Sequence, residues 1–297
     1  MALVHPPGLT RFRTHDLPGS RRLAGWEEHN ARALVGLRVT PQADRPFDGT
    51  EVNLTLPRLH VARVTGSPHA VERDVRQIAE HPADGLVVYF MLAGESRFEH
   101  RGGRELVVPG QALVLDGDQP FRREFSEGLT ELVLKAPRRG PVRPQVFSFR
   151  DNAHAQALVS ALSGALRGPA DWDGLEHTAT DLLDTLLGAR TPTADLAAAH
   201  AFIAAHLHEQ ELCALRIAAA IGYSERHLSR LFAKSGQSVP QAILNARLDA
   251  ARLLLVQPIT LAEVAARTGF VSQAHFSRTY RARFGATPRQ DRAALRS

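Results

Sequence analysis

The chain has 297 residues but only one cysteine, and it has no long apolar run. The single cysteine, Cys213, cannot form a disulfide within the chain, which excludes a fold held together by disulfides. No apolar stretch approaches the roughly 20 residues that span a bilayer, and the N-terminus lacks the apolar core of a signal peptide. We therefore expect a cytoplasmic protein that does not enter membranes.

Motifs of several common enzyme classes are missing as well. The sequence has no nucleophile motif, no glycine-rich loop that would cradle a phosphate, and no Cys/His spacing typical of zinc sites. Hydrophobic residues make up 44% and charged residues 23%, which is ordinary for a globular chain long enough for two domains. We expect no catalytic residues, no metal and no cofactor.

Positive charge is concentrated in the last third of the chain. From residue 195 onward there are 13 Lys and Arg against 7 Asp and Glu, whereas the preceding residues have 23 against 24. A basic surplus confined to one region indicates contact with a polyanion such as nucleic acid, although a basic solvated surface gives the same count.

Up to about residue 150 the sequence favours strands. Residues 1–25 mix Pro, Gly, His and Arg without periodicity and are expected to form a loosely ordered tail. Residues 26–150 contain apolar or alternating runs, such as GLVVYFMLAG and QALVLDG, separated by turn residues. This pattern is typical of an antiparallel sheet or barrel, with a hairpin turn at His100–Arg104.

Helical periodicity follows a connector that is rich in Pro and Arg. Residues 151–190 contain two amphipathic segments, Ala153–Arg167 and Leu175–Leu187, which could pack on the sheet or form the seam of a homodimer. A short linker then leads to a region of helical pattern at residues 195–297.

This C-terminal region contains an internal repeat. The segment ALRIAAAIGYSERHLSRLF aligns with LAEVAARTGFVSQAHFSRTY at an offset of 47 residues, which becomes 48 after an extra Val271. Each unit has the parts of a helix-turn-helix. In the second unit, Thr260 and Glu263 predict a capping box, Gly269 can end the first helix, and Ser272 can cap the next.

The second helix of each unit has an apolar side and a side with small, polar and basic residues. Phe276, Tyr280 and Phe284 are expected to face a core, as are Leu228, Leu231 and Phe232 in the first unit. If only one helix had such a polar side, ordinary solvent-exposed surface would be the better interpretation. Because both units of the repeat have it, the pattern favours helices that enter the major groove. There, Arg, Gln and Ser bind bases and phosphates. The outward residues are Arg226, Ser229, Arg230 and Ala233 in the first unit, and Gln273, Ala274, Ser277, Arg278 and Arg281 in the second.

A single helical pattern joins the two units, from Pro240 to about Val256. Its 17 residues correspond to a length of roughly 25 Å. Such a helix could hold two recognition helices near the separation of roughly 34 Å between successive major grooves on one face of DNA.

The C-terminal hundred residues closely resemble the AraC/XylS family of bacterial transcription regulators. The resemblance rests on IAAAIGYSERHLSRLF and on ITLAEVAARTGFVSQAHFSRTYRARFGATPRQDR. It implies seven helices, two helix-turn-helix units joined by a long helix, promoter DNA as the partner, recruitment of RNA polymerase, and activation. His227 matches His275 in the repeat, so it could contact DNA, but it could equally lie against the turn. By motif position the resemblance implies DNA contacts at Arg226, Ser229, Arg230, Gln273, Ala274, His275, Ser277 and Arg278.

The N-terminal half resembles the cupin-type sensing domain of the same family through GLVVYFMLAGESRFEHRGGRELVVPGQALVLDGDQPFRREF. The expected fold class is therefore α+β, with a cupin-like β-barrel and following helices, and an all-α C-terminal domain. The resemblance implies a small-molecule effector of unknown identity and dimerisation through this half. Six residues are chemically suited to a carboxylate or aromatic ligand, although residues of these types are more often surface or packing residues: Trp26, His60, Arg63, Tyr89, Arg97 and Arg122.

Two alternatives to an effector-controlled activator stay open. Many cupins are metal enzymes, but between Val87 and Gln119 the only histidine is His100, and Glu99 would point to the opposite face of its strand. The second alternative is a DNA-binding regulator that responds to its own concentration or to a protein partner. A cavity inside the barrel would favour control by a small molecule, and a filled barrel would favour this second alternative.

Overall fold

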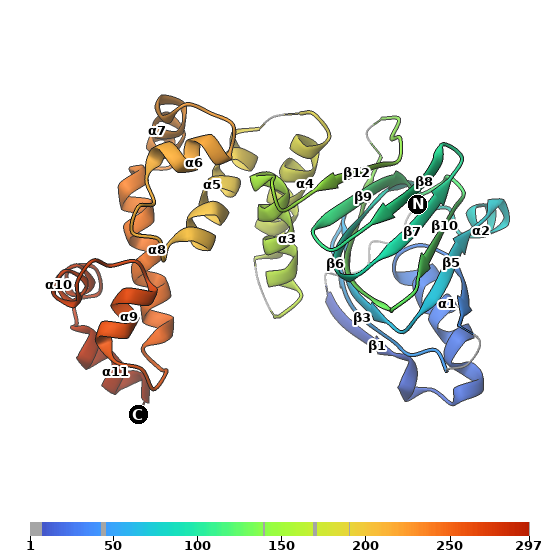
Figure 1. Cartoon of the computed structure of the whole chain (residues 1–297), viewed down its shortest axis with the longest axis horizontal. Coiled ribbons are helices and arrows are strands. Elements are labelled where there is room, and N and C mark those ends of the chain that lie inside the picture. Colours follow the sequence, from blue (N-terminus) through green and yellow to red (C-terminus); the bar gives the residue numbers. More distant parts are fainter. Residues whose placement is uncertain (1–7, 43–45, 139, 169–170, 190, 297) are drawn as a thin grey trace. The chain divides into compact units, whose positions relative to one another are not determined.

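The computed structural model describes residues 8–42, 46–138, 140–168, 171–189 and 191–296 (Figure 1). The chain divides into two compact units, which we describe separately. The sheet unit comprises Met1–Asp151 and Leu158–Thr180, and the helical unit comprises Asn152–Ala157 and Asp181–Ser297. Within the described ranges, none of the helices has the length and apolar character needed to cross a membrane.

The sheet unit contains two antiparallel sheets. The larger has seven strands in the order β1-β3-β4-β11-β6-β9-β12, and the smaller has five in the order β2-β5-β10-β7-β8. The strands are β1 Gly8–Arg13, β2 Arg38–Pro41, β3 Gly49–Thr55, β4 His60–Gly66, β5 His69–Arg73, β6 Gly85–Gly94, β7 Ser96–His100, β8 Gly103–Val107, β9 Gln111–Asp116, β10 Phe121–Phe125, β11 Leu129–Pro137 and β12 Gln145–Ser148.

The expected α+β class, with a sheet-rich domain and a separate helical domain, is confirmed, but the described strands do not form a closed barrel. The chain changes sheets at several points, and two of them lie between β6 and β7 and between β10 and β11. Both passages turn at glycine, since Gly94 has φ 79° and Gly128 has φ 84°. A Cβ on Gly94 would lie 2.2 Å from the Gly128 carbonyl oxygen. These two corners place consecutive strands in different sheets, without pairing between them.

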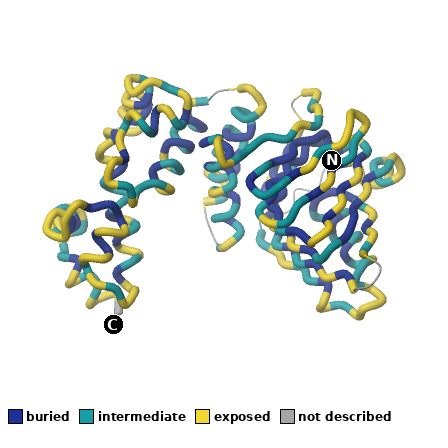
Figure 2. The backbone as a smooth tube through the Cα atoms, viewed as in Figure 1, coloured by how far each residue is buried: buried dark blue, intermediate teal, exposed yellow. Residues whose placement is uncertain are grey.

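The core of the sheet unit lies between the two sheets. Alternate residues of each strand point inward, so that Tyr89 of β6 and Val133 of β11 share one cluster with Phe98 of β7 and Phe121 of β10. Helix α1 (Arg22–Ala33) adds Trp26, which is also buried in this cluster. The burial is visible as the dark blue strands of Figure 2. Each such side chain stabilises the fold by roughly 1.5–3 kcal/mol relative to an exposed one.

The expectation of a loosely ordered N-terminal tail is wrong for residues 8–25. Strand β1 pairs along its whole length with β3. The Thr14 hydroxyl donates to Asp48 at 2.9 Å, and the ring of Phe12 stacks on His29 with centroids 4.3 Å apart. Strand pairing with a distant segment leaves little trace in local sequence, which explains the error. Residues 1–7 lie outside the described residues.

Two helices follow the sheets, and seven more follow residue 191 in the described chain. Helix α3 (Ala153–Ala165) begins in the helical unit and continues in the sheet unit, and α4 is Trp172–Leu186. These seven helices agree with the number that the resemblance to the AraC/XylS family implies. They are α5 Pro192–His206, α6 Ala214–Ala220, α7 Glu225–Lys234, α8 Val239–Leu254, α9 Leu261–Arg267, α10 Gln273–Phe284 and α11 Pro288–Arg296.

Candidate DNA interface and effector cavity

The first helix-turn-helix consists of α6 and α7. Gly222 has φ 75° in the turn, and the Ser224 hydroxyl accepts a hydrogen bond from the His227 N–H at 3.3 Å, which caps α7. Cys213 at the start of α6 makes no side-chain cap. The residues expected to face inward are buried, namely Leu228, Leu231 and Phe232. Those expected to face outward are exposed, namely Arg226, Ser229, Arg230 and Ala233.

The second helix-turn-helix consists of α9 and α10. The predicted capping box is present, since the Thr260 N–H donates to Glu263 at 2.7 Å and the Glu263 N–H donates to the Thr260 hydroxyl at 3.1 Å. The Ser272 hydroxyl caps α10. Phe276 and Tyr280 are buried and Phe284 is partly buried. The opposite side presents half-buried Ser277 and the exposed residues Gln273, Ala274, His275, Arg278 and Arg281.

The two equivalent histidines lie in different environments. The ring of His227 stacks on Tyr223 of the turn, with centroids 4.0 Å apart and an interplanar angle of 6°. His227 therefore packs against the turn, one of the two possibilities that the sequence left open. His275 is exposed, and its ring lies 5.7 Å from Phe270 in an edge arrangement. Of the two, His275 is the one available to a partner.

A polar connection fixes the second unit to the end of α5. Arg247 of α8 donates to the carbonyl oxygens of Leu207 at 2.9 Å and Glu209 at 2.7 Å. Gly269, with φ 76°, lies against the same place, because a Cβ there would be 2.2 Å from the Leu207 oxygen. The turn before α10 is thus seated on the segment that leads into the first unit.

A second connection holds the rear of α10 on α8. The Arg283 guanidinium donates to the Asn245 carbonyl and to Asp249, the latter at 2.9 Å. The Tyr280 hydroxyl donates to Asp291 of α11 at 2.5 Å, and burial together with this carboxylate raises the pKa of Tyr280. The side chains that anchor α10 are therefore separate from those on its outward side.

The outward arginines of α7 and α10 have no acidic partner among the described residues. They are Arg226 and Arg230 on α7 and Arg278 and Arg281 on α10. By contrast, Arg252 and Arg283 pair with Asp291 and Asp249. Cations that are exposed and unpaired are available to the phosphates and guanine edges of DNA.

The sheet unit brings together only two of the six effector candidates. Trp26 and Tyr89 are buried and line one small internal cavity. Arg63, Arg97 and Arg122 are exposed on the opposite faces of their strands, and His60 is half-buried at the start of β4.

The sequence interpretation missed the charged pair at the centre of this unit. Arg123 and Glu131 are 1% and 4% exposed, and the guanidinium donates to both carboxylate oxygens, at 3.1 and 2.7 Å. The Arg123 guanidinium also lies 4.1 Å above the Tyr89 ring. The alternation in FRREF could have found it, because Arg123 shares a face with the two phenylalanines and Arg122 does not.

Burial also shifts the titration of two aromatic groups beside this pair. Desolvation raises the pKa of Tyr89 to about 12. Desolvation lowers the pKa of His69 to about 4; the hydrogen bond to Ser67 acts in the opposite direction, and the charge of Arg123 adds a smaller lowering. His69 Nδ1 donates to the Ser67 carbonyl at 2.7 Å, so the neutral ring has its hydrogen bond. Both groups are neutral in the folded unit at physiological pH.

The space between the sheets is nearly filled, whereas a larger cavity opens at one end. The internal cavity beside Trp26 and Tyr89 has a volume of about 30 Å³, comparable to one water molecule. The open cavity has a volume of about 320 Å³. It is lined by Phe98, His100, Arg101, Gly102, Leu115, Asp116, Gln119, Pro120, Phe121, Arg143 and Pro144.

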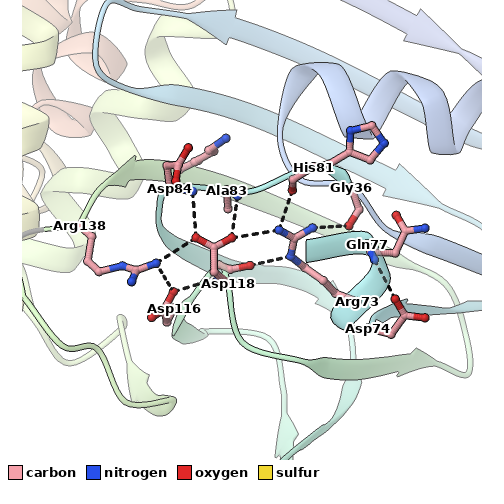
Figure 3. Close-up of polar contacts among 12 residues, drawn as sticks. Gly36, Arg73, Asp74, Gln77, His81, Ala83, Asp84, Asp116, Asp118 and Arg138 are labelled. Carbon is pink, nitrogen blue, oxygen red and sulfur yellow. Dashed lines mark hydrogen bonds and ion pairs between the residues drawn. The ribbon is translucent and has the colours of Figure 1, made fainter. Parts of the chain in front are cut away.

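A polar network holds the loops beside the open cavity (Figure 3). Arg73, which is fully buried, donates to the carbonyls of Gly36, His81 and Gly117 and to Asp118. Burial acts to raise the pKa of Asp118, but hydrogen bonds from two backbone N–H groups and from Arg73 outweigh it and lower the pKa. Arg138 bridges Asp118 and Asp116, at 3.0 and 2.7 Å.

Comparisons with known proteins found two matching domain models and several similar regulators. The model of an AraC-binding-like domain matches residues 26–217, and that of a helix-turn-helix domain matches residues 217–294. The transcriptional activator NphR of Rhodococcus sp is 27% identical over 95% of this chain and 92% of its own length. The regulator CdhR of Pseudomonas aeruginosa is 44% identical over 29% of this chain and 26% of its own length. The DNA-binding domain of AdpA, solved with a target DNA, is 31% identical over 34% of this chain and 93% of its own length, with a TM-score of 0.32.

The fold and the matched domains define a transcription regulator with a sheet-rich domain and a double helix-turn-helix. The AraC-binding-like model covers more than half of the chain, so this chain belongs to the AraC family of DNA-binding transcription regulators. The members matched here are described as regulators rather than enzymes.

Proposed function

We propose that α7 and α10 of one chain read two adjacent major-groove segments of promoter DNA. The observation that carries this proposal is the pair of capped helices whose outward arginines are unpaired, on a scaffold fixed by Arg247 and Arg283. The connecting helix α8 has 16 residues and a length of roughly 24 Å, which suits recognition helices in neighbouring grooves.

The proposed contacts fall into two groups. Arg230 and Arg278 are assigned to base edges, with Arg226, Ser229, Gln273, Ala274, His275 and Ser277 close to the same grooves. Arg281 lies a further turn along the exposed side of α10 and is assigned to phosphate. Ala274 and Ser277 are small, so they allow the helix backbone to approach the bases.

We further propose that a small molecule bound in the sheet unit controls DNA binding. The open cavity of about 320 Å³ supports this, because ligand sites typically have volumes of about 300–1,000 Å³. Activation through RNA polymerase is proposed from the likeness to NphR, which is described as an activator. The division into residues 26–150, 151–190 and 195–297, with the middle segment as a dimer seam, belongs to the same proposal.

A ligand-independent regulator is the second candidate. The observation in its favour is the nearly filled space between the sheets, with a cavity of only about 30 Å³. In that case the DNA affinity of the purified protein would already be sufficient for occupancy of its sites, and control would come from concentration or from a protein partner.

Selection of genome fragments by the purified full-length chain, at one stated salt concentration, tests the proposal. Enrichment of a paired motif whose elements lie about one helical turn apart is expected. Retention of random fragments would contradict sequence-specific reading. Repeating the selection with cell metabolites removed or added separates the two candidates, since only the effector-controlled regulator changes its enrichment.

A further inference from the structure

The open cavity of the sheet unit has an apolar floor. Phe98 of β7, Leu115 of β9 and Phe121 at the start of β10 line it, and all three belong to the core between the sheets. The rings of Phe98 and Phe121 lie 6.2 Å apart. Pro120 and Pro144 add apolar lining without a backbone N–H. An apolar or aromatic group would leave water on entering this space.

The rim of the cavity is cationic. Arg101 lies in the turn after β7, and Arg143 lies in the segment that leads to β12. Both are exposed, and neither has an acidic partner in the part of the chain that the structure describes. The nearby acids have other partners, because Glu99 pairs with Arg104 at 3.0 Å and Glu105 lies 3.7 Å from His100.

The one acidic side chain of the lining is neutralised from outside the cavity. Asp116 accepts a hydrogen bond from Arg138 at 2.7 Å and another from the Asp118 N–H at 2.9 Å, as Figure 3 shows for this network. His100 Nδ1 accepts from the Gly102 N–H at 3.0 Å, so the neutral ring has its proton on Nε2. The balance of charge at the lining is therefore positive, and an anion entering it meets no unpaired carboxylate.

We propose that this cavity binds a small carboxylate with an aromatic or compact apolar body, which is the effector of the proposed function above. The body packs on Phe98, Leu115 and Phe121, and the carboxylate accepts hydrogen bonds from Arg101 and Arg143, since guanidinium groups bind carboxylates in bidentate fashion. The volume of about 320 Å³ is at the lower end of the range for ligand sites, which limits the ligand to a small molecule.

The test uses the full chain and two fluorinated probes of nearly equal shape, 4-fluorobenzoate and its neutral amide. Binding is measured by ¹⁹F line broadening during titration of the protein. The variants are Arg101→Ala/Arg143→Ala and, as a matched control, Arg97→Ala. Arg97 is an exposed arginine on β7 that lies outside the lining. Affinity of every variant for a selected DNA site is measured in parallel, without probe.

We expect the wild type and Arg97→Ala to bind the benzoate, and the double variant to bind it at least roughly tenfold more weakly, with the amide weak throughout. Equal binding of acid and amide, benzoate binding that survives the double substitution, or no benzoate binding by any protein would overturn the anion site. DNA affinity is measured separately from probe binding. If the double variant binds the selected DNA site as the wild type does, the proposed DNA binding is supported even when the anion site is overturned. Benzoate binding that leaves DNA affinity unaltered would support the site and contradict its role in control.

Discussion

At the scale of single residues, the pair Arg123–Glu131 places two charges in the buried core of the sheet unit. Replacing Arg123 by Met leaves a buried carboxylate without its partner, and we expect a loss of about 3–5 kcal/mol in the free energy of unfolding. The double variant Arg123→Met/Glu131→Leu should regain most of that loss, because no unpaired charge is left. Urea titration followed by tryptophan fluorescence measures it, since Trp26 and Trp172 both belong to the sheet unit. A loss below about 1 kcal/mol in the single variant would contradict the buried pairing.

His69 gives the sheet unit a pH dependence of defined sign. Its pKa is lowered to about 4 in the folded unit, so between pH 6.5 and pH 4 the unfolded chain takes up a proton that the folded unit does not. Stability should therefore fall with decreasing pH, by about 2 kcal/mol from this group between pH 8 and pH 5. His69→Gln should show a correspondingly smaller difference in urea titrations at the two pH values. An unchanged pH dependence in the variant would rule out His69 as the cause.

Two arginines one turn apart on α10 should affect DNA binding differently. Arg278→Ala should weaken binding to the selected site by roughly 1–3 kcal/mol and leave binding to random DNA nearly unchanged. Arg281→Ala should weaken both, and should reduce the slope of log affinity against log salt by about 1. Anisotropy titrations on both DNAs at several salt concentrations distinguish these outcomes. Specific loss in Arg281→Ala, or uniform loss in Arg278→Ala, would reverse the assignments.

At the scale of elements, the turn before α10 is held in place by a close contact between Gly269 and the Leu207 carbonyl oxygen. Gly269 and Gly285 both have φ 76°, but a Cβ would meet the Leu207 oxygen at 2.2 Å only at Gly269 and has open space at Gly285. The variants Gly269→Ala and Gly285→Ala both place an alanine in the left-handed conformation, which costs about 1–2 kcal/mol. Gly269→Ala should lose additional stability in thermal unfolding followed by helical circular dichroism, and should lose DNA affinity. Equal losses would show that the contact with Leu207 does not position the turn.

The helices and their caps could be predicted from sequence, whereas the strand pairing of the sheet unit and its cavity could not. Thr260 and Glu263 act over three residues, and the apolar side of α10 follows from local spacing, so neither depends on distant parts of the chain. The inward face of a strand can be predicted where large apolar residues mark it, and in FRREF the two phenylalanines indicate that Arg123 rather than Arg122 lies inside. The pairing of β1 with β3 and the cavity at the end of the sheets depend on segments far apart in sequence.

At the scale of the whole molecule, we propose that the helical unit recognises DNA and that the sheet unit senses the effector. Two helix-turn-helix units connected through α8 can read a longer site than one, because each adds its own base contacts. Control by a ligand requires that the ligand and the DNA change each other's affinity by the same factor. Under the proposed effector control, a ligand bound to the sheet unit therefore changes the DNA affinity of the full-length chain by a factor that can be measured.

We propose that α7 and α10 read two separate sequence elements of one DNA site. Selection from random DNA with the wild type, Arg230→Ala and Arg278→Ala in parallel tests it most directly. We expect two elements about 10 base pairs apart for the wild type, with Arg230→Ala relaxing the base preference in one element and Arg278→Ala in the other. If both variants relax the same base positions, or if neither changes the selected motif, the claim is contradicted.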